Sequence, residues 1–422
     1  MTRLCVYLYD VRLGWLEQDK DPRFFDFRVD PSVFTHFRNA STVMSITVPL
    51  VPQMNRKHTK RRMNFFSELL PEGRTLSFLA QNARLDESDA FGLLTRYGID
   101  VAGALKIFPE ADEPYIIGGG EVGACKKSPY CSIVDDVQVR NLLEDVAQTP
   151  LGNAQITGKI SLAGMQTKIV LARTEEGQWA QTHNGYPSTH IIKPKSGQHP
   201  SMIFDESWGL ELARCIGLIE YSSRLEEFDG LSTLVIERYD RNVNFPGGRI
   251  HQEDFNQALG IKGAQKYQEM GGRVSLKLIA QKFEEHADPL AIQFLAKQLI
   301  FALAIGNLDL HAKNISVLHY PDESSEIAPA YDLVPMQHYE SDGRLAMSVG
   351  GEYLHRNLKL KHIVDEMLSW NALKIQPRIA VEEFVTEYLK KILKHAEKVE
   401  IPDQAYPRLF ENFQENCNRL IG

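Results

Sequence analysis

The order of helix and strand signals along the chain limits its fold more than any other feature of the sequence. Apolar residues recur at helical spacing in three long segments of the second half, residues 276–286, 289–305 and 381–399. The first half instead alternates short apolar runs with turn residues. This order predicts an α+β chain in which a mixed part is followed by a mainly helical part.

Local patterns predict individual elements of the first part. Segments with the short apolar pattern of a strand are residues 3–9, 98–108 after an initial turn, 168–172, 189–193 and 234–237. Segments with helical spacing that end at a breaker are residues 65–70 and 206–217. We expect loops at residues 118–120 and 126–129.

Composition excludes several classes of protein. The net charge of −8 rules out an overall basic footprint for nucleic acid, and the local basic stretches 56–62 and 390–394 favour solvated faces over DNA contacts. The five cysteines form no CxxC pair, which argues against a disulfide framework or a zinc site. The most apolar run, residues 299–305, is too short to cross a bilayer. We therefore expect a soluble cytoplasmic protein.

A run of polar residues follows the apolar segment that ends at Ile305. Within it, Asp309 and Asn314 have the five-residue separation of the catalytic Asp and the metal-binding Asn in protein kinases, and Asp332 lies downstream. Phosphoryl transfer needs a base for the attacking hydroxyl and oxygen ligands for Mg²⁺. The pattern predicts Asp309 as the base and Asn314 with Asp332 as the magnesium ligands. His311 in the same run is either a structural histidine or a phosphate contact.

Residues that would hold a nucleotide lie upstream and carry weaker signals. Lys193 ends a predicted strand, where a lysine can neutralise phosphates as a point charge. Residues 161–168 (SLAGMQTK) form a candidate phosphate loop that contains one glycine and matches neither the Walker pattern nor GxGxxG. A charged cluster at residues 236–241 is either an adenine-binding connector or a surface salt-bridge patch.

These residues resemble the HipA family of toxin kinases, the toxins of a class of bacterial toxin–antitoxin pairs. Blocks similar to those of the family occur in order at residues 44–49, 64–73, 91–105, 161–168, 249–260, 306–314 and 331–332. The resemblance implies a bilobal protein-kinase-like fold, with a mixed α/β N-terminal lobe and a mainly helical C-terminal lobe. It divides the chain into three parts. These are a HipA-type N-terminal subdomain at residues 1–110, a nucleotide-binding part of the N-terminal lobe at residues 111–245, and a helical C-terminal kinase lobe at residues 246–422.

The resemblance also implies ATP- and Mg²⁺-dependent phosphorylation of serine or threonine in a protein substrate, with growth arrest as the result. An aminoacyl-tRNA synthetase is one candidate target. Asp309 is similar to the family's catalytic base, and Asn314 and Asp332 to its metal ligands. The positions similar to its ATP-binding residues are Ala163, Gly164, Met165, Gln166, Thr167, Lys168, Lys193, Glu237, Tyr239, His311, Asn314 and Asp332.

Regulation follows from the same resemblance. Ser161 is similar to a serine that such kinases autophosphorylate, and a phosphate there adds about −1.5 to −2 charges beside the triphosphate site. We expect this modification to switch off ATP binding. The implied partners are a HipB-like helix-turn-helix antitoxin and, through that complex, operator DNA; no membrane contact is implied.

Two other interpretations stay open. A corepressor subunit would need only the antitoxin and DNA contacts, and a small-molecule kinase would use the same base and metal ligands on another substrate. The sequence departs from the family pattern at Leu308 and Leu310, where polar residues are common, and at Met165, where a smaller residue is common. These departures bear on the identity of the target and leave the chemistry intact.

Overall fold

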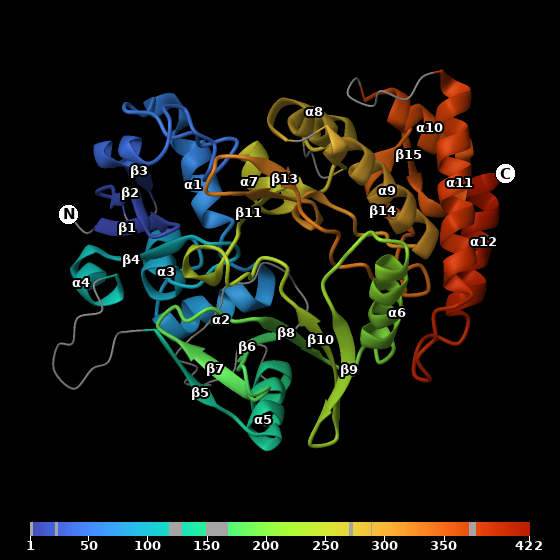
Figure 1. Cartoon of the computed structure of the whole chain (residues 1–422), viewed down its shortest axis with the longest axis horizontal. Coiled ribbons are helices and arrows are strands. Elements are labelled where there is room, and N and C mark those ends of the chain that lie inside the picture. The colour runs from blue at the N-terminus through green and yellow to red at the C-terminus, as the bar shows by residue number, and fades with distance from the viewer. Residues whose placement is uncertain are drawn as a thin grey trace. The chain divides into compact units, whose positions relative to one another are not determined.

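The computed structural model of the chain describes residues 3–21, 24–117, 129–148, 168–269, 273–287, 289–370 and 377–422. It is a mixed α+β structure, as predicted, and it divides into two compact units (Figure 1). The first unit comprises Met1–Pro194, Glu227–Gly263 and Leu318–Ser324, and the second comprises Lys195–Glu226, Ala264–Val317 and Ser325–Gly422. The three-part division at residues 110 and 245 stays a prediction.

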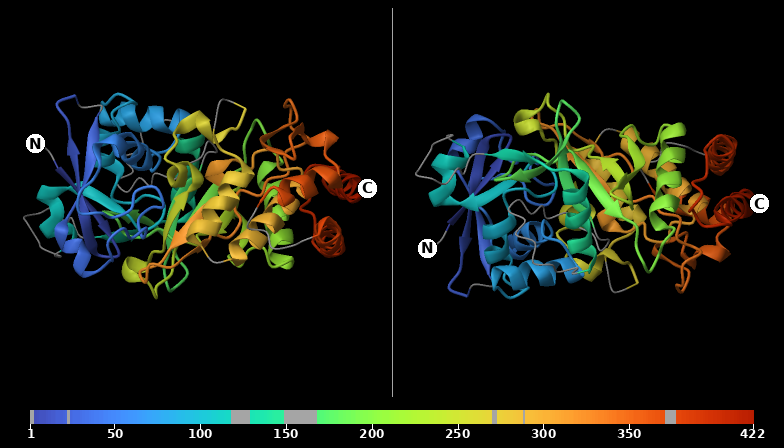
Figure 2. Two further views of the ribbon diagram at one scale, coloured as in Figure 1. Left: turned by 90° about the horizontal axis from the view of Figure 1, so that it is seen from above. Right: turned by 90° about the horizontal axis from the view of Figure 1, so that it is seen from below.

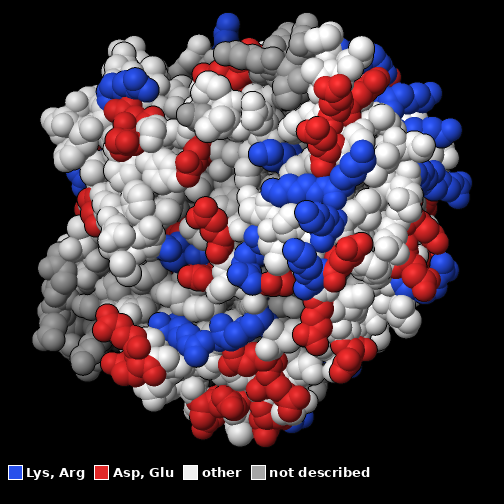
Figure 3. All heavy atoms as spheres, turned by 45° about the vertical axis from the view of Figure 1, so that its right-hand side comes forward, with Lys and Arg blue, Asp and Glu red and all other residues white. Residues whose placement is uncertain are grey.

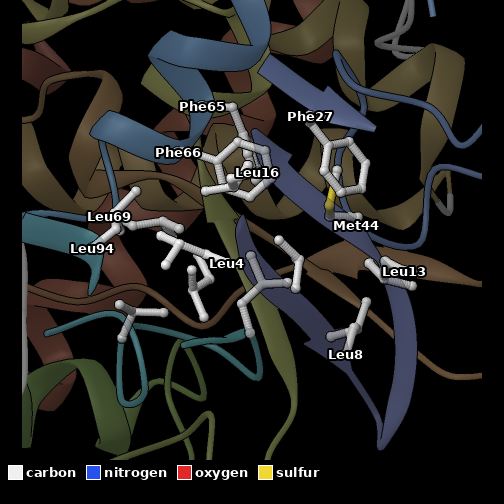
Figure 4. Packing of buried hydrophobic residues seen from close by; sticks show 14 of the residues in the cluster. Leu4, Leu8, Leu13, Leu16, Phe27, Met44, Phe65, Phe66, Leu69 and Leu94 are labelled. Carbon is white, nitrogen blue, oxygen red and sulfur yellow. The ribbon is translucent and has the colours of Figure 1, made fainter. Parts of the chain in front are cut away.

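An antiparallel sheet of four strands begins the first unit. Its strands, in spatial order, are β3 (Phe25–Val29), β2 (Val11–Gln18), β1 (Arg3–Leu8) and β4 (Lys106–Pro109). The helices that accompany it are α1 (Thr59–Ser67), α2 (Gly73–Ala83), α3 (Ala90–Tyr97) and α4 (Glu113–Ile116). Figure 4 shows the core of this region, where Leu4 and Leu16 of the sheet lie near Phe65 and Phe66 of α1. Both faces of β1 are covered, which explains its continuous apolar sequence.

A six-stranded sheet follows, with the strands that the sequence predicted near the nucleotide residues. In spatial order they are β5 (Tyr130–Ile133), β7 (Trp179–His183), β6 (Ile169–Arg173), β8 (His190–Pro194), β10 (Leu231–Glu237) and β9 (Ser223–Phe228). Helix α5 (Asp136–Gln148) packs Val139 and Leu143 against Leu171, Ile192 and Val235 of the sheet. A smaller sheet has the order β11 (His251–Asp254), β12 (Ser316–His319) and β13 (Ser325–Ile327), and α7 (Phe255–Leu259) follows β11.

Five buried charges join the turn after α3 to the chain after β10, within the first unit. Asp240 forms ion pairs with Arg238 at 2.7 Å and Arg241 at 2.8 Å, and Asp100 pairs with Arg249 at 2.5 Å. The side chains of all five are at most 5% exposed, so three guanidiniums share two carboxylates away from water. Burial, together with the charge of Arg238, lowers the pKa of Arg241 to about 9.

The second unit is built around α9 (Leu290–Ile305). Twelve of its sixteen residues are buried, so it is apolar on all sides and suits a central position. Helices α8 (Leu276–His286), α11 (Arg378–Ala396) and α12 (Leu409–Ile421) contact it, and α11 and α12 lie side by side (Figure 2). The remaining elements are α6 (Met202–Cys215), α10 (Leu360–Leu368) and the hairpin of β14 (Arg344–Val349) and β15 (Glu352–Leu354).

Most predicted elements are confirmed, with shifted ends. The strands near residues 3, 106, 169, 190 and 231 and the helices near residues 202, 276, 290 and 378 are all present. The helix predicted at residues 65–70 was placed wrongly: α1 spans Thr59–Ser67, and Leu69 and Leu70 lie in the following turn. Their burial, at 2% and 4% exposed, produced the misleading apolar pattern. The loop predicted at residues 118–120 and most of that at 126–129 lie outside the described residues. Among the helices described, none has the length and apolar character to cross a membrane.

Candidate functional site

A glycine turns the chain from the central helix into the predicted catalytic loop. Gly306 follows the last residue of α9 with a φ of 72°, a left-handed conformation that glycine adopts at little cost. A Cβ atom at this position would lie 2.7 Å from Oε1 of Gln337. The left-handed conformation favours glycine here, and the turn marks where residues 307–314 leave the helix.

Asn307 connects the two predicted acidic residues. It is 1% exposed, its Oδ1 accepts from the amide of Asp309 at 2.9 Å, and its Nδ2 donates to the carbonyl oxygen of Asp332 at 3.0 Å. One buried side chain therefore holds the backbone of Asp309 and the backbone of Asp332 at once. Its position in the polar run is visible in the sequence, but its role is not.

Asp309, Asn314 and Asp332 lie together in the second unit. Nδ2 of Asn314 donates to the carbonyl oxygen of Asp309 at 2.8 Å and lies 3.4 Å from Oδ2 of Asp332. The bond to Asp309 fixes the amide plane of Asn314, so its Oδ1 is the atom that a cation beside Asp332 would use. The side chain of Asp309 is 37% exposed, whereas Asn314 is 6% exposed. Asp309 is thus open to solvent, while Asn314 is buried and held by its hydrogen bond.

The donor set fits magnesium better than a transition metal. In the part of the chain that the structure describes, no three His, Cys, Asp or Glu side chains are grouped to hold a metal ion. One carboxylate and one amide oxygen are the kind of partial ligand set that Mg²⁺ uses when phosphates and water complete its octahedron. Asp332 has a φ of 57°, a conformation that costs a non-glycine residue energy and that occurs often at functional sites.

His311 is buried in the same loop and is neutral near pH 7. Burial, and next the charge of Lys266, lower its pKa to about 3. Its Nε2 lies 3.8 Å from Oδ2 of Asp309, and its ring packs edge-on against Tyr267 at 5.4 Å. Its Nδ1 has no hydrogen-bond partner among the described residues. The histidine therefore borders the base without forming a charged pair with it.

Tyr331 braces the loop from the residue next to Asp332. Its hydroxyl donates to the carbonyl oxygen of Lys313 at 2.7 Å and lies 2.6 Å from Oγ of Ser316. Sequence reasoning placed Tyr331 in a family block without giving it this role. The contact joins the segment that contains Asp332 to the C-terminal end of the catalytic loop.

Leu308 and Leu310 point away from solvent on both sides of Asp309. Each is 7% exposed, and both line a small apolar cavity with Leu299, Leu303 and Met347. The carbonyl oxygen of Leu308 accepts from the amide of Ala346 in β14 at 3.0 Å. Core packing accounts for the apolar character of these two positions.

Four more of the predicted nucleotide residues can be described, and these four belong to the first unit. Ile169 of β6 pairs with Ile192 of β8, so Lys168 and Lys193 each lie one residue beyond this pair at the same end of adjacent antiparallel strands. Like charges in such positions repel unless an anion lies near them. Glu237 ends β10 and is exposed, and the hydroxyl of Tyr239 donates to Oε1 of Gln252 at 2.5 Å.

The other predicted nucleotide residues lie outside the described residues. These are Ala163, Gly164, Met165, Gln166 and Thr167, and Ser161, the predicted autophosphorylation site, also lies outside the described residues.

The basic stretches do not form a uniform positive surface. Arg62, the last residue of the first stretch, is 3% exposed and its guanidinium grips Asp26 through bonds of 2.6 and 2.9 Å. In the second stretch, Lys391 donates to the carbonyl oxygen of Ile216 at 2.8 Å. Figure 3 shows lysine and arginine side chains interspersed with acidic ones on the side of the molecule that carries α11. The solvated-face interpretation fits these contacts, with Arg62 as a structural exception.

Known protein families account for most of the chain. Residues 160–399 match the HipA-like C-terminal domain, and residues 4–108 match the HipA N-terminal domain. The chain belongs to the HipA family. It is 34% identical to the candidate kinase Y4mE of Sinorhizobium fredii over 72% of each chain. It is 27% identical to the serine/threonine-protein kinase toxin HipA of Shewanella oneidensis over 72% of this chain and 70% of that protein.

A solved structure supports the fold. The HipA-family fold of this chain superimposes on a chain of the complex of HipA, HipB and operator DNA from Shewanella oneidensis with a TM-score of 0.78. The superposition covers 99% of this chain and 96% of the other, at 23% sequence identity. At this identity the likeness concerns the fold alone. The chain is thus a HipA-like kinase by family, related to the toxin of a toxin–antitoxin system.

Proposed function

We propose that this HipA-family chain is an ATP- and magnesium-dependent serine/threonine protein kinase, with the two-lobed arrangement of protein kinases. The observation that supports this best is the grouping of Asp309, Asn314 and Asp332 around one amide side chain. The proposal adds a protein substrate and a metal to the kinase assignment that the family provides.

Each of these residues has one task in the proposed reaction. Asp332 with Oδ1 of Asn314 would hold the metal, which would supply neutralisation of phosphate charge. Asp309 orients a substrate hydroxyl and accepts its proton as the oxygen attacks the γ-phosphorus. A new oxygen–phosphorus bond forms, the bond from the γ-phosphorus to the bridging oxygen breaks, and ADP leaves with that electron pair. Neutral His311 excludes water beside Asp309 without supplying a competing charge.

The first unit supplies the proposed nucleotide contacts. Lys168 and Lys193 would neutralise phosphate charge, and Glu237 with Tyr239 would hold adenine at the end of β10. Residues 163–167 would complete the phosphate loop, and phosphorylation of Ser161 would oppose ATP binding by repulsion.

A toxin role with a HipB-like antitoxin belongs to the same proposal. The solved complex of the Shewanella oneidensis proteins contains HipB and operator DNA, which favours an equivalent assembly for this chain in the cytoplasm. Most DNA affinity in such a complex would come from the antitoxin, because Arg62 and Lys391 of the two basic stretches make contacts within the chain. A corepressor role can coexist with catalysis.

Phosphate transfer from radiolabelled ATP in a bacterial lysate tests the proposal. Asp309→Asn is compared with Asp403→Asn, which makes the same chemical change at an exposed position of the second unit. We expect wild type and Asp403→Asn to label a protein and Asp309→Asn to lose about 10²–10⁴-fold of the rate. Labelling of small alcohols in place of protein would support a small-molecule kinase, and equal labelling by Asp309→Asn would refute the assigned base.

A further inference from the structure

One face of α6 contacts the chain on the C-terminal side of Asp332. Asp205 and Gly209 are four residues apart on this helix, and side chains at that spacing lie on the same face. Asp205 is fully buried, at 0% exposed. Its Oδ2 accepts from the hydroxyls of Ser201 at 2.8 Å and Tyr339 at 2.7 Å.

Two more partners complete the environment of Asp205. Nε2 of His338 lies 3.1 Å from the same Oδ2, and the amide of Tyr406 donates to Oδ1 at 2.7 Å. His338 also stacks on Tyr406, with ring centroids 4.0 Å apart. A buried carboxylate is stable only when its oxygens are satisfied in this way. Asp205 therefore holds residues 338 and 339 firmly against α6.

Gly209 lets α6 approach the backbone directly after Asp332. A Cβ atom on Gly209 would lie 2.3 Å from the carbonyl oxygen of Leu333, a distance that real Cβ atoms do not reach. Glycine within a helix normally costs about 1 kcal/mol relative to alanine. This close approach explains why the helix has glycine there.

The segment needs such support because of the conformation of Asp332. Its φ of 57° is unfavourable for a residue with a Cβ atom, and such a conformation persists only when the surroundings impose it. On the N-terminal side, the buried hydroxyl of Tyr221 donates to the carbonyl oxygen of Ala330 at 2.7 Å. On the C-terminal side, Gly209 and Asp205 provide the contacts described above.

We infer that the Asp205–Gly209 face of α6 positions Asp332 for metal binding, so that Asp205 and Tyr339 are positioning residues for the metal site. The inference rests on the proposed function, because it assigns a purpose to the support of the metal ligand. None of these residues touches substrate or metal. They act by fixing the direction in which the carboxylate of Asp332 points.

Mild substitutions test this without unfolding the unit. Tyr339→Phe removes one hydroxyl from Asp205, and Gly209→Ala adds one methyl group against Leu333. Tyr388→Phe is the matched control, since it removes a hydroxyl from a buried tyrosine of α11 that no described contact joins to the segment. The first measurement is Mn²⁺ binding by electron paramagnetic resonance in the presence of a non-hydrolysable ATP analogue. The second is the Mg²⁺ concentration that gives half the maximal rate of phosphate transfer.

We expect Tyr339→Phe to weaken Mn²⁺ binding and raise the half-saturating Mg²⁺ concentration by about five- to tenfold, which is part of the free energy of one hydrogen bond to a charged group. Gly209→Ala should change the Mn²⁺ affinity and the half-saturating Mg²⁺ concentration by more than Tyr339→Phe does, although alanine favours helices. In both variants the rate at saturating Mg²⁺ should recover to within about twofold, while Tyr388→Phe stays at wild-type values.

The possible failures are distinguishable. A wild-type protein that transfers no phosphate, or an Asp309→Asn variant as active as wild type, would refute the proposed function. The positioning role alone would be refuted by another pair of results. In that case the wild type transfers phosphate, and Tyr339→Phe and Gly209→Ala bind Mn²⁺ as tightly as Tyr388→Phe does. Lower rates at saturating Mg²⁺ with unchanged Mn²⁺ affinity would also refute it, because the defect would then be independent of the metal.

Discussion

The loop that contains Asp309 and the segment that contains Asp332 are held by different kinds of contact. In the loop, the hydrogen bonds that shape the chain span few residues: Asn307 to Asp309, and Asn314 back to Asp309. The segment depends on partners far away in the sequence, since Tyr339 bonds to Asp205 across 134 residues and Ala330 to Tyr221 across 109. Asp309, the proposed base, thus sits in a turn with several local hydrogen bonds, whereas Asp332, the proposed metal ligand, depends more on partners far away in the sequence.

Removing the charge of Asp332 should have the largest effect. Asp332→Asn keeps a residue that tolerates the left-handed conformation, so the fold should survive while the metal is lost. We expect a loss of about 10³-fold or more in phosphate transfer, which electrostatic stabilisation of this kind provides. Nucleotide affinity measured with and without Mg²⁺ distinguishes the roles of the two regions. Asp332→Asn should abolish the gain in nucleotide affinity that Mg²⁺ gives, and Asp309→Asn should keep it. If both variants keep the gain, Asp332 is not a metal ligand.

Substitution of Asn307 should break the connection between the two regions. Asn307→Ala removes the acceptor for Asp309 and the donor to Asp332, so we expect a loss of about 2–3 kcal/mol, or roughly 30- to 150-fold in rate. Asn307→Asp keeps the acceptor for Asp309, but it loses the donor to Asp332 and places a carboxylate oxygen against the carbonyl oxygen of Asp332. The phosphate-transfer rate of Asn307→Asp should therefore depend less on the Mg²⁺ concentration than that of wild type. A titration of the rate against Mg²⁺ measures this. Identical titrations for the two variants would show that Asn307 acts only on the base.

Acid should destabilise the second unit through the catalytic loop. The pKa of His311 is about 3 in the folded chain against about 6.5 when unfolded, so the unfolded state binds more protons between these values. The contribution is fully present above pH 6.5 and is lost as the pH falls toward 3, which amounts to about 2 kcal/mol at pH 5. Urea unfolding at pH 7.5 and 5.0 should show this loss in wild type and in His395→Gln, a control on α11. His311→Gln should lose less between the two pH values, and an unchanged loss would assign the effect elsewhere.

Removing the brace at Tyr331 should have the smallest effect. Tyr331→Phe deletes the hydroxyl that donates to Lys313 and contacts Ser316, at a cost of about 1 kcal/mol, or roughly fivefold in rate. Because the brace lies between the two regions, both the rate at saturating Mg²⁺ and the Mg²⁺ requirement should change. A defect in only one of them would show which region the tyrosine supports.

The sequence predicts the local part of this arrangement well. The five-residue separation of Asp309 and Asn314 identifies the loop, and the helix at residues 276–286 and the end of the central helix at Ile305 are predicted to the residue. Periodicity reports which side of an element is buried, and a glycine reports where the helix ends. Leu69 and Leu70 show the limit of this logic, because buried turn residues imitate a helical face.

The support of Asp332 could not be predicted in the same way. Asp205 appears in the sequence as one acidic residue on a helix, and nothing near it indicates Tyr339 or Tyr406. The packing of α6 against residues 333–339 supplies His338 and Tyr339, while Ser201 and Tyr406 supply the other two partners. The unfavourable φ of Asp332 is likewise a property of the folded unit.

The buried charges of the first unit also bear on whether the chain can be shortened from its N-terminus. Asp100 lies in the segment that matches the HipA N-terminal domain, whereas its partner Arg249 lies in the segment that matches the C-terminal domain. A shortened chain that began after residue 110 would leave Arg238, Arg241 and Arg249 with Asp240 as the one remaining carboxylate of the five charges. Isolated cations of this kind are costly away from water. We therefore expect a chain that begins after residue 110 to be less stable than the full chain.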